Sequence, residues 1–181
     1  MPEGFVQRHG SISELRKKVD SLLSGVEGKK ILFAGCGDGM ECESAIRKGA
    51  KVIGIDISDK LIGLANKELG DRADFRVMAQ GKLRFKGSSF DNIVSILSVM
   101  YEKDLTKILR EFGRVLKRNG FIVLVAPHPI QKMVKYSKGN YFVRGKKFEA
   151  FRGGRRFNYY RLLEDYFDSI IGARLKVEKV L

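Results

Sequence analysis

Short apolar runs alternate with amphipathic segments through most of the chain, beginning near Lys30. The segments between the runs, at about 40–48, 59–69 and 103–117, place their apolar residues at helical spacing. Runs that are apolar at every position predict strands buried on both faces, and strands alternating with helices predict a parallel sheet. The predicted strands are Ile31–Ala34, Val52–Ile57, Phe75–Met78, Ile93–Leu97 and Phe121–Ala126. The pattern therefore predicts an α/β fold with a doubly wound sheet flanked by helices.

The two ends of the chain extend this pattern. Residues 1–28 are expected to hold one helix, because Ser11 and Glu14 have capping-box spacing and apolar residues follow at helical intervals. Near the other end, a helix at about 159–171 and a strand at about 174–180 are expected. We interpret the chain as a single domain spanning 1–181, since its 181 residues fit one domain better than two.

Composition excludes several classes of protein. Hydrophobic residues make up 44 % and charged residues 31 %, which is ordinary for a globular protein. Two cysteines are too few for a disulfide framework or a zinc site, so we expect no bound metal. The first ten residues lack the apolar stretch of a signal peptide, and no aliphatic run is long enough to cross a membrane. We therefore expect a cytoplasmic protein.

Residues 128–158 form a basic aromatic insert in the α/β pattern. The chain carries a formal net charge of +14, and residues 132–161 hold ten basic residues and one acid. Eight of the 18 aromatic residues lie in the same window, and Gly145 suggests the turn of a small hairpin. Three interpretations stay open: a nucleic-acid surface, a lid over an anionic or aromatic small molecule, and a solvated basic surface.

A glycine-rich turn follows the first predicted strand directly, as Gly35-Cys36-Gly37-Asp38-Gly39. Such glycines allow a sharp strand-to-helix turn and a close approach of a ligand to the main chain. Asp56 ends the second strand, where an acid can accept both hydroxyls of a ribose. Met40 occupies the place of the third glycine of a dinucleotide fingerprint, and no Walker loop is present. The turn and Asp56 together predict a nucleoside-binding site.

The segment ILFAGCGDG, followed by VIGIDIS, resembles the class I S-adenosylmethionine-dependent methyltransferases. SSFDNIVSILSVMYEKDL and LTKILREFGRVLKRNGFIVLVAP resemble two further motifs of that family, so the resemblance covers about residues 29–127. FNYYRLLEDYFDSIIGARLKVEKVL looks like the tail of small-molecule methyltransferases related to quinone-biosynthesis enzymes. The resemblance implies S-adenosyl-L-methionine as cofactor and a Rossmann-like, mainly parallel sheet. Because the family's usual sheet has seven strands and the pattern here predicts six, we expect six or seven.

The resemblance also implies which residues bind the cofactor. Asp56 is expected to bind the ribose, and an acid that the family places two positions before the first glycine is Phe33 here. Backbone carbonyls of the turn and Asp38 are expected to replace that acid at the methionine amino group. Gln80 stands near the family's adenine-binding acid, and its side-chain oxygen can accept from the adenine amine. The full expected set is Gly35, Cys36, Gly37, Asp38, Gly39, Asp56, Ile57, Ala79, Gln80 and Ile96.

No catalytic residue is identified by the sequence. His128 and Tyr101 are candidates, since both follow strands whose carboxyl ends face the ligand, and His9 is a weaker one. Tyr101, His128, Tyr160 and Arg161 are expected on the substrate side. Asp91 opens a strand and is interpreted as structural. Methyl transfer is an in-line displacement that depends chiefly on positioning, so a missing base does not argue against an enzyme.

The sequence thus predicts an S-adenosylmethionine-dependent methyltransferase with a small-molecule acceptor, anionic or aromatic in character. One alternative is an RNA methyltransferase that uses residues 132–161. The other is a protein that binds S-adenosylmethionine without turnover. The amine-methylating signature Asn/Asp-Pro-Pro-Tyr/Phe is replaced by Ser95-Ile96-Leu97-Ser98, which argues against base amines and leaves other RNA targets open.

Overall fold

A parallel sheet forms the centre of the computed structural model, which describes residues 12–136, 138–151 and 154–180. Its strands are β1 (Lys30–Ala34), β2 (Lys51–Asp56), β3 (Asp74–Val77), β4 (Phe90–Ile96) and β5 (Leu116–Val125). Their order is β3-β2-β1-β4-β5, and every neighbouring pair is parallel. The strand order reverses between β1 and β4, so these two strands define the switch point where α/β folds bind ligands.

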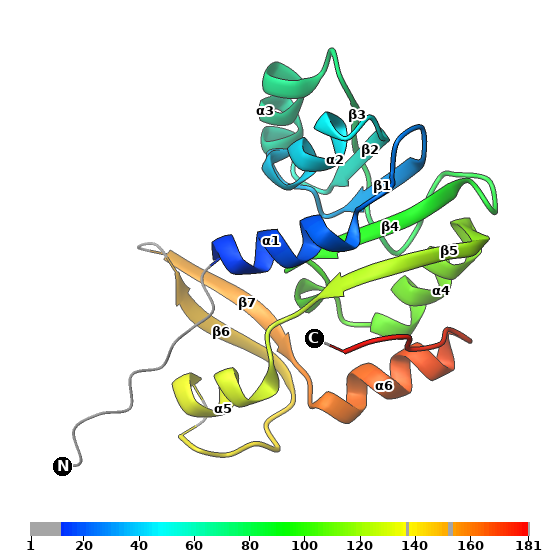
Figure 1. The fold of residues 1–181 in the computed structure, drawn as a ribbon. Helices are drawn as coiled ribbons and strands as arrows, with labels where there is room; N and C mark the ends of the chain where they lie inside the picture. The colour runs from blue at the N-terminus through cyan, green and yellow to red at the C-terminus, as the bar shows by residue number, and fades with distance from the viewer. Residues whose placement is uncertain (1–11, 137, 152–153, 181) are drawn as a thin grey trace.

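Helices cover both faces of this sheet, as the strands' double-sided hydrophobicity requires (Figure 1). Ile31 and Phe33 of β1 pack on one face, and Leu32 and Ala34 pack on the other. The first face is covered by α1 (Ile12–Leu22), α2 (Glu43–Arg47) and α3 (Asp59–Leu69), with the short 3-10 helix η1 (Met40–Cys42) before α2. The second face is covered by α4 (Leu105–Val115) and α6 (Leu163–Gly172). The doubly wound α/β prediction is confirmed.

The predicted count of six or seven strands is wrong, because the sheet has five within the described residues. The strand expected at 174–180 is not formed. After α6, Arg174 adopts a positive φ of 59° and Leu175 packs into the apolar layer beneath the sheet, beside Ile170. That packing draws the chain out of the plane of the sheet, so the segment does not pair with β5.

The insert folds into α5 (Pro129–Tyr136) and an antiparallel hairpin of β6 (Gly145–Phe151) and β7 (Gly154–Tyr160). The predicted turn at Gly145 is wrong, because this glycine opens β6 opposite Tyr160. The strands pair as far as Phe151 and Gly154, and residues 152–153 lie outside the described ranges. Phe148 pairs with Phe157 across the strands, a contact that fixes the register. Because β7 extends to Tyr160, the last helix begins at Leu163 rather than near 159.

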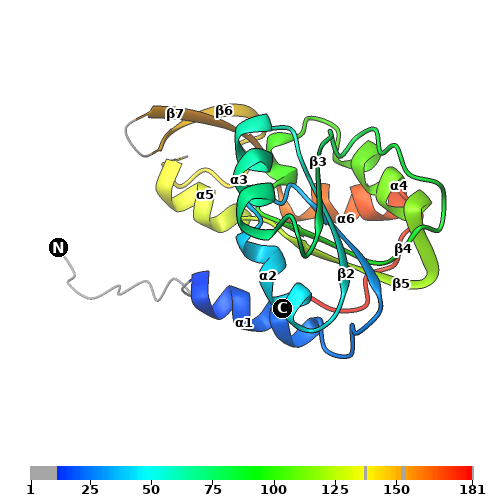
Figure 2. The same ribbon diagram turned by 90° about the horizontal axis from the view of Figure 1, so that it is seen from above.

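The hairpin and α5 lie at the end of the sheet toward which β4 and β5 run (Figures 1 and 2). β7 packs against η2 (Val99–Tyr101), the 3-10 helix that follows β4. The insert therefore covers the carboxyl ends of the strands. No helix among the described ranges is long and apolar enough to cross a membrane.

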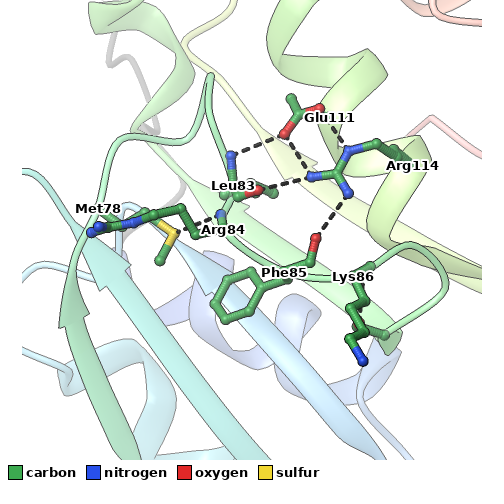
Figure 3. A network of polar contacts seen from close by, with 8 residues as sticks. Met78, Leu83, Arg84, Phe85, Lys86, Glu111 and Arg114 are labelled. Atoms are coloured by element: carbon green, nitrogen blue, oxygen red, sulfur yellow. Dashed lines mark hydrogen bonds and ion pairs between the residues drawn. The ribbon is translucent and has the colours of Figure 1, made fainter.

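A polar network on α4 holds the loop that joins β3 to β4 (Figure 3). Arg114 donates to the carbonyls of Leu83 and Phe85 at 2.9 and 2.8 Å, and Glu111 accepts from the Leu83 amide at 2.9 Å. Arg114 also pairs with Glu111, which lowers the pKa of that carboxyl. This network fixes the path of the loop that begins at Ala79 and Gln80, on the ligand side of the sheet.

Candidate active site

The glycine turn after β1 is held in a left-handed conformation at three positions. The φ angles of Gly35, Gly37 and Gly39 are 73°, 57° and 84°. A Cβ on Gly35 would lie 2.3 Å from the Cβ of Ser98, so this glycine lets the turn pack directly against the end of β4. A Cβ on Gly37 would meet nothing within 4 Å. Gly35 is therefore needed for packing, while Gly37 exposes its backbone on the open side of the turn.

Asp56 at the end of β2 is bonded to this turn. Its two carboxylate oxygens accept from the amides of Gly37, at 3.0 Å, and Ser58, at 2.9 Å. The Ser58 hydroxyl in turn accepts from Leu61 and caps α3, so Ser58 rather than Asp56 is the helix cap. Each Asp56 oxygen retains a lone pair, because a carboxylate offers about four acceptor positions. The half-buried carboxylate is thus placed to accept further hydroxyls.

Ile57 and Ala79 lie on the surface beside Asp56, and Ile57 is 68 % exposed. An exposed aliphatic side chain next to an acid that has free acceptor positions suits the face of a purine. Gln80 is different, because only 6 % of it is exposed and its side-chain oxygen lies 3.4 Å from the Ser98 hydroxyl. The amide is turned inward, so its predicted contact with the adenine amine requires the side chain to rotate.

A buried hydroxyl network at the end of β4 escaped the sequence analysis. Ser98 donates to the carbonyl of Ala34 at 3.0 Å, and its hydroxyl lies 2.7 Å from that of Ser95. Leu97, between them, adopts a φ of 50°, which is uncommon for a residue other than glycine. Ile96 is half-buried against the first apolar layer. These contacts join the ends of β1 and β4. No sequence motif predicts a leucine with a positive φ angle, so the network could not be foreseen.

Cys36 belongs to the turn only through its backbone. Its amide donates to Ile55 at 2.9 Å, its side chain is buried, and burial raises the pKa of the thiol to about 12. A thiol in this state is not a nucleophile. Phe33 is also buried, at 2 % exposed, and packs in the apolar layer of α1–α3. Asp38 is exposed and accepts from the amide of Met40 at 3.2 Å. It is the one carboxylate in the turn Gly35–Gly39.

Aromatic rings from η2 and the hairpin pack against one another beyond the end of β4. Tyr101 meets Phe157 edge to face at 6.2 Å between centroids, and Phe157 meets Phe148 and Tyr159 at 6.4 and 5.9 Å. The ammonium of Lys146 lies 4.3 Å from the centroid of Phe157. The sequence predicted Tyr101 here, but it did not single out Phe157, which lies at the centre of the group.

Arg161 is engaged with the loop after β4 and does not lie on an open surface. Its guanidinium donates to the carbonyls of Val99, Glu102 and Lys103. Burial lowers the pKa of Arg161. Burial also raises the pKa of the neighbouring Tyr166, which the sequence analysis did not select. Tyr160 is buried, with the ammonium of Lys132 5.3 Å from its ring centroid.

His128 follows β5 as expected and is exposed. Its Nδ1 accepts from the amide of Ile130 at 3.2 Å, and its carbonyl accepts from Gln131 at 3.0 Å. The side chain therefore caps the start of α5. The role of His128 as a base stays a prediction. Because Nδ1 already accepts a hydrogen bond, the base would have to be Nε2. His9, the other histidine, lies outside the described residues.

The geometry fits a nucleoside cofactor at the switch point between β1 and β4. The turn offers an exposed backbone at Gly37, Asp56 offers acceptors, and Ile57 offers an open apolar surface. No cluster of metal-ligating side chains is found in the described part of the chain.

Comparison with known proteins identifies the family. A family model described as a methyltransferase domain matches residues 32–124, about half of the chain. A ubiquinone biosynthesis O-methyltransferase of Sinorhizobium medicae is 32 % identical over 54 % of this chain and 40 % of its own length. An uncharacterized protein of Haemophilus influenzae is 26 % identical over 94 % of this chain and 77 % of its own. This chain thus spans less than half the length of the named O-methyltransferase.

The fold also matches a solved structure. A putative S-adenosylmethionine-dependent methyltransferase from Listeria monocytogenes superposes with a TM-score of 0.76 at 22 % identity, over 90 % of this chain and 84 % of that one. With the matched family model and the switch-point site, these findings establish that the chain belongs to the methyltransferase domain family and is an S-adenosylmethionine-dependent methyltransferase.

Proposed function

We propose that the enzyme methylates a small molecule that carries an aromatic or anionic group. The observation that carries this proposal is the group of rings from Tyr101, Phe157 and Tyr159, with Lys146 beside it, over the ends of β4 and β5. Rings can enclose a planar substrate, and cations can balance its charge. The named relative's action on an oxygen supports an oxygen acceptor.

The cofactor contacts in this proposal come from both sides of the switch point. Asp56 accepts the ribose hydroxyls, and Ile57 and Ala79 flank the adenine. Gly37 lets the cofactor approach the backbone, while Gly35 and Gly39 allow the turn to pack closely against Ser98 and Leu69 and so give it the shape that receives the cofactor. Ile96 lies beside the cofactor at the end of β4. Asp38 and the turn's carbonyls hold the methionine ammonium, because the acid of the family pattern is replaced by the buried Phe33.

Positioning is the main contribution of the protein to the reaction. S-adenosylmethionine, when bound, would supply a methyl group on a positively charged sulfur; a nucleophilic oxygen, nitrogen or carbon of the acceptor would take the methyl group, and the sulfur would leave as the neutral thioether of S-adenosylhomocysteine. Tyr101 orients the acceptor in the proposed site, and Arg161 holds the loop that carries Tyr101 in place. His128 is placed after β5 to receive a proton at Nε2 from an acceptor that must lose one.

A second candidate acceptor is RNA, favoured by the exposed cations of the hairpin. Lys146 and Lys147 are both exposed. Arg144, in contrast, pairs with Asp165, and its charge is therefore partly balanced within the fold. A protein that binds cofactor without turnover is disfavoured, because the family match is to enzymes of methyl transfer.

Measurement of S-adenosylhomocysteine formation tests the proposal. The full chain should convert S-adenosylmethionine in the presence of phenols or aromatic carboxylates, and it should not respond to short single-stranded RNA. Product formed with RNA and with none of the small acceptors would contradict the small-molecule proposal. A Phe142→Ala variant is a suitable control, because this ring is 73 % exposed and contacts Tyr141 rather than the Tyr101 group.

A further inference from the structure

Asn158 of β7 is a fully buried amide, with none of its surface exposed. Neither its side-chain nitrogen nor its oxygen has a hydrogen-bond partner among the described residues. Buried polar groups in proteins nearly always have a partner, because an apolar interior does not replace the hydrogen bonds made by water. An amide with both ends unpaired therefore points to a ligand that supplies a donor and an acceptor.

Asn158 borders a cavity of about 10 Å³ at the carboxyl end of the sheet, with room for one atom the size of an oxygen. The other walls include Met100 of η2, Pro127 after β5, Lys132 of α5 and Tyr160. Since η2 follows β4 and Pro127 follows β5, the cavity lies on the acceptor side of the switch point. Tyr101, the neighbour of Met100, belongs to the aromatic group over the same strand ends. A substrate held by those rings can therefore place a polar substituent in the cavity.

Basic side chains contribute to the lining of the cavity. Its lining includes two cations, Lys132 and Arg161, and no acid. Arg161 is bonded to three carbonyls of the loop after β4. The ammonium of Lys132 lies 5.3 Å from the centroid of the Tyr160 ring. An amide N–H beside an ammonium group favours an anionic oxygen. The amide oxygen requires a donor, which a hydroxyl of the same ligand or a water molecule supplies.

We propose that Asn158 and Lys132 bind an oxyanion of the methyl acceptor, a carboxylate or phenolate, and so determine which acceptors the enzyme takes. The inference rests on the proposed function and narrows the acceptor to small aromatic anions. The Asn158 amide donates to the anionic oxygen, and Lys132 balances its charge. Neither residue belongs to the cofactor site, so cofactor binding does not depend on them.

The test is a titration of the full chain, saturated with S-adenosylhomocysteine, with benzoate and with benzyl alcohol, followed by ligand-detected NMR. The wild type should prefer benzoate, because the two probes differ mainly in charge. Asn158→Leu should weaken benzoate binding roughly tenfold, and Lys132→Gln should act in the same direction. Asn158→Asp should weaken it further, since it places a carboxylate next to the bound anion.

Lys147→Gln is the matched control, because Lys147 lies opposite Asn158 in the hairpin register but is exposed. It should leave benzoate affinity unchanged. If Asn158→Leu fails to fold, Lys132→Gln decides the question alone. Unchanged benzoate affinity in Asn158→Leu or Lys132→Gln, with S-adenosylhomocysteine binding intact, would mean that the amide holds only a structural water. A wild type without preference for benzoate would also overturn the assignment. Absence of S-adenosylhomocysteine binding in the wild type would instead contradict the proposed function.

Discussion

The turn after β1 and the β6–β7 hairpin both border the active site, but they are held by different kinds of contact. The turn is fixed by backbone groups, with Gly35 and Cys36 donating to Ile55, and Gly37 donating to Asp56. The hairpin is fixed by side chains that are far apart in sequence, such as Tyr101 with Phe157 and Arg161 with the loop after β4. Contacts of the first kind follow from the pairing of β1 with β2, which the pattern of apolar runs predicts. Contacts of the second kind depend on which side chains meet in the assembled fold. We expect substitutions in the two regions to separate cofactor binding from acceptor use.

The largest effect is expected from Gly35→Ala compared with Gly37→Ala. A methyl group on Gly35 would lie 2.3 Å from the Ser98 Cβ at a positive φ, so we expect a loss of about 3 kcal/mol or more in unfolding free energy. Gly37→Ala meets no atom within 4 Å, so we expect about 1 kcal/mol of backbone strain and weaker cofactor binding. Urea denaturation and calorimetric titration measure the two effects. Equal stability of both variants would mean that the turn does not pack against β4.

Removal of the Asp56 carboxylate should weaken cofactor binding without affecting the hairpin region. We expect Asp56→Ala to weaken S-adenosylhomocysteine binding by about 1.5–3 kcal/mol, because a charged acceptor of the ribose hydroxyls is lost. Asp59→Ala is the control, since Asp59 is exposed in the first turn of α3. Isothermal titration decides the matter, and unchanged affinity in Asp56→Ala would remove this residue from the site.

The aromatic group should affect the acceptor alone. We expect Phe157→Ala to lower kcat/KM for an accepted aromatic substrate roughly tenfold, because the ring that joins Tyr101 to the hairpin is lost. Cofactor affinity should stay within error of the wild type, and Phe142→Ala should leave both quantities unchanged. A parallel fall in cofactor affinity in Phe157→Ala would show that the two regions are not separable.

A smaller effect, on the stability of the whole fold, is expected at the amino end of β4, opposite the candidate site. Asp91 accepts from the Lys30 amide at 2.9 Å and pairs with Lys117 at 2.8 Å, and both contacts lower the pKa of its carboxyl, the ion pair most. A carboxyl whose pKa falls on folding stabilises the fold above its unfolded pKa of about 4 and loses that effect as the pH drops through the folded value.

Asp91→Asn should therefore cost about 1 kcal/mol at pH 7, and the difference from wild type should shrink in acid. Urea denaturation from neutral to acidic pH measures it, with Asp71→Asn as an exposed control. A cost that is independent of pH would contradict the pairing of Asp91 with Lys117. Neither cofactor nor acceptor binding should change, since Asp91 opens β4 at the end remote from the site.

The weakest effect concerns RNA. We expect sequence-indifferent binding with a Kd of ~10–100 μM near physiological salt, because the hairpin's exposed cations contact phosphates without a dedicated module. Fluorescence anisotropy across a salt series should show a fall in affinity, reduced in a Lys146→Gln, Lys147→Gln double variant. Sub-micromolar binding at high salt would make RNA the acceptor and would overturn the small-molecule proposal.

Several site residues followed from sequence, because they occupy fixed places relative to predictable elements. The apolar runs placed β1, β2 and β4 within a few residues, and a strand end locates whatever follows it at the ligand edge of a parallel sheet. Gly35, Gly37 and Asp56 were therefore foreseeable. Gln80 was foreseeable in position only, because its inward turn depends on the buried hydroxyl of Ser98.

The hairpin region was predicted only in outline. Its basic and aromatic composition marked a distinct segment, but Gly145, where a turn was expected, is paired with Tyr160 at the start of β6. Register in an antiparallel pair depends on which side chains meet across the strands, and alternation alone permits several registers. The strand expected at 174–180 is not formed, and Leu175 packs instead in the apolar layer between the sheet and its covering helices.

The sequence by itself determined the α/β fold, the glycine turn and the acid at the end of β2, since each depends on local backbone conformation and the spacing of apolar residues. Tertiary structure alone decided that Gln80 turns toward Ser98, that Arg161 holds the loop after β4, and that the buried Asn158 amide has no hydrogen-bond partner among the described residues. These outcomes arise from which distant side chains share a volume, and the local pattern of a chain does not specify that.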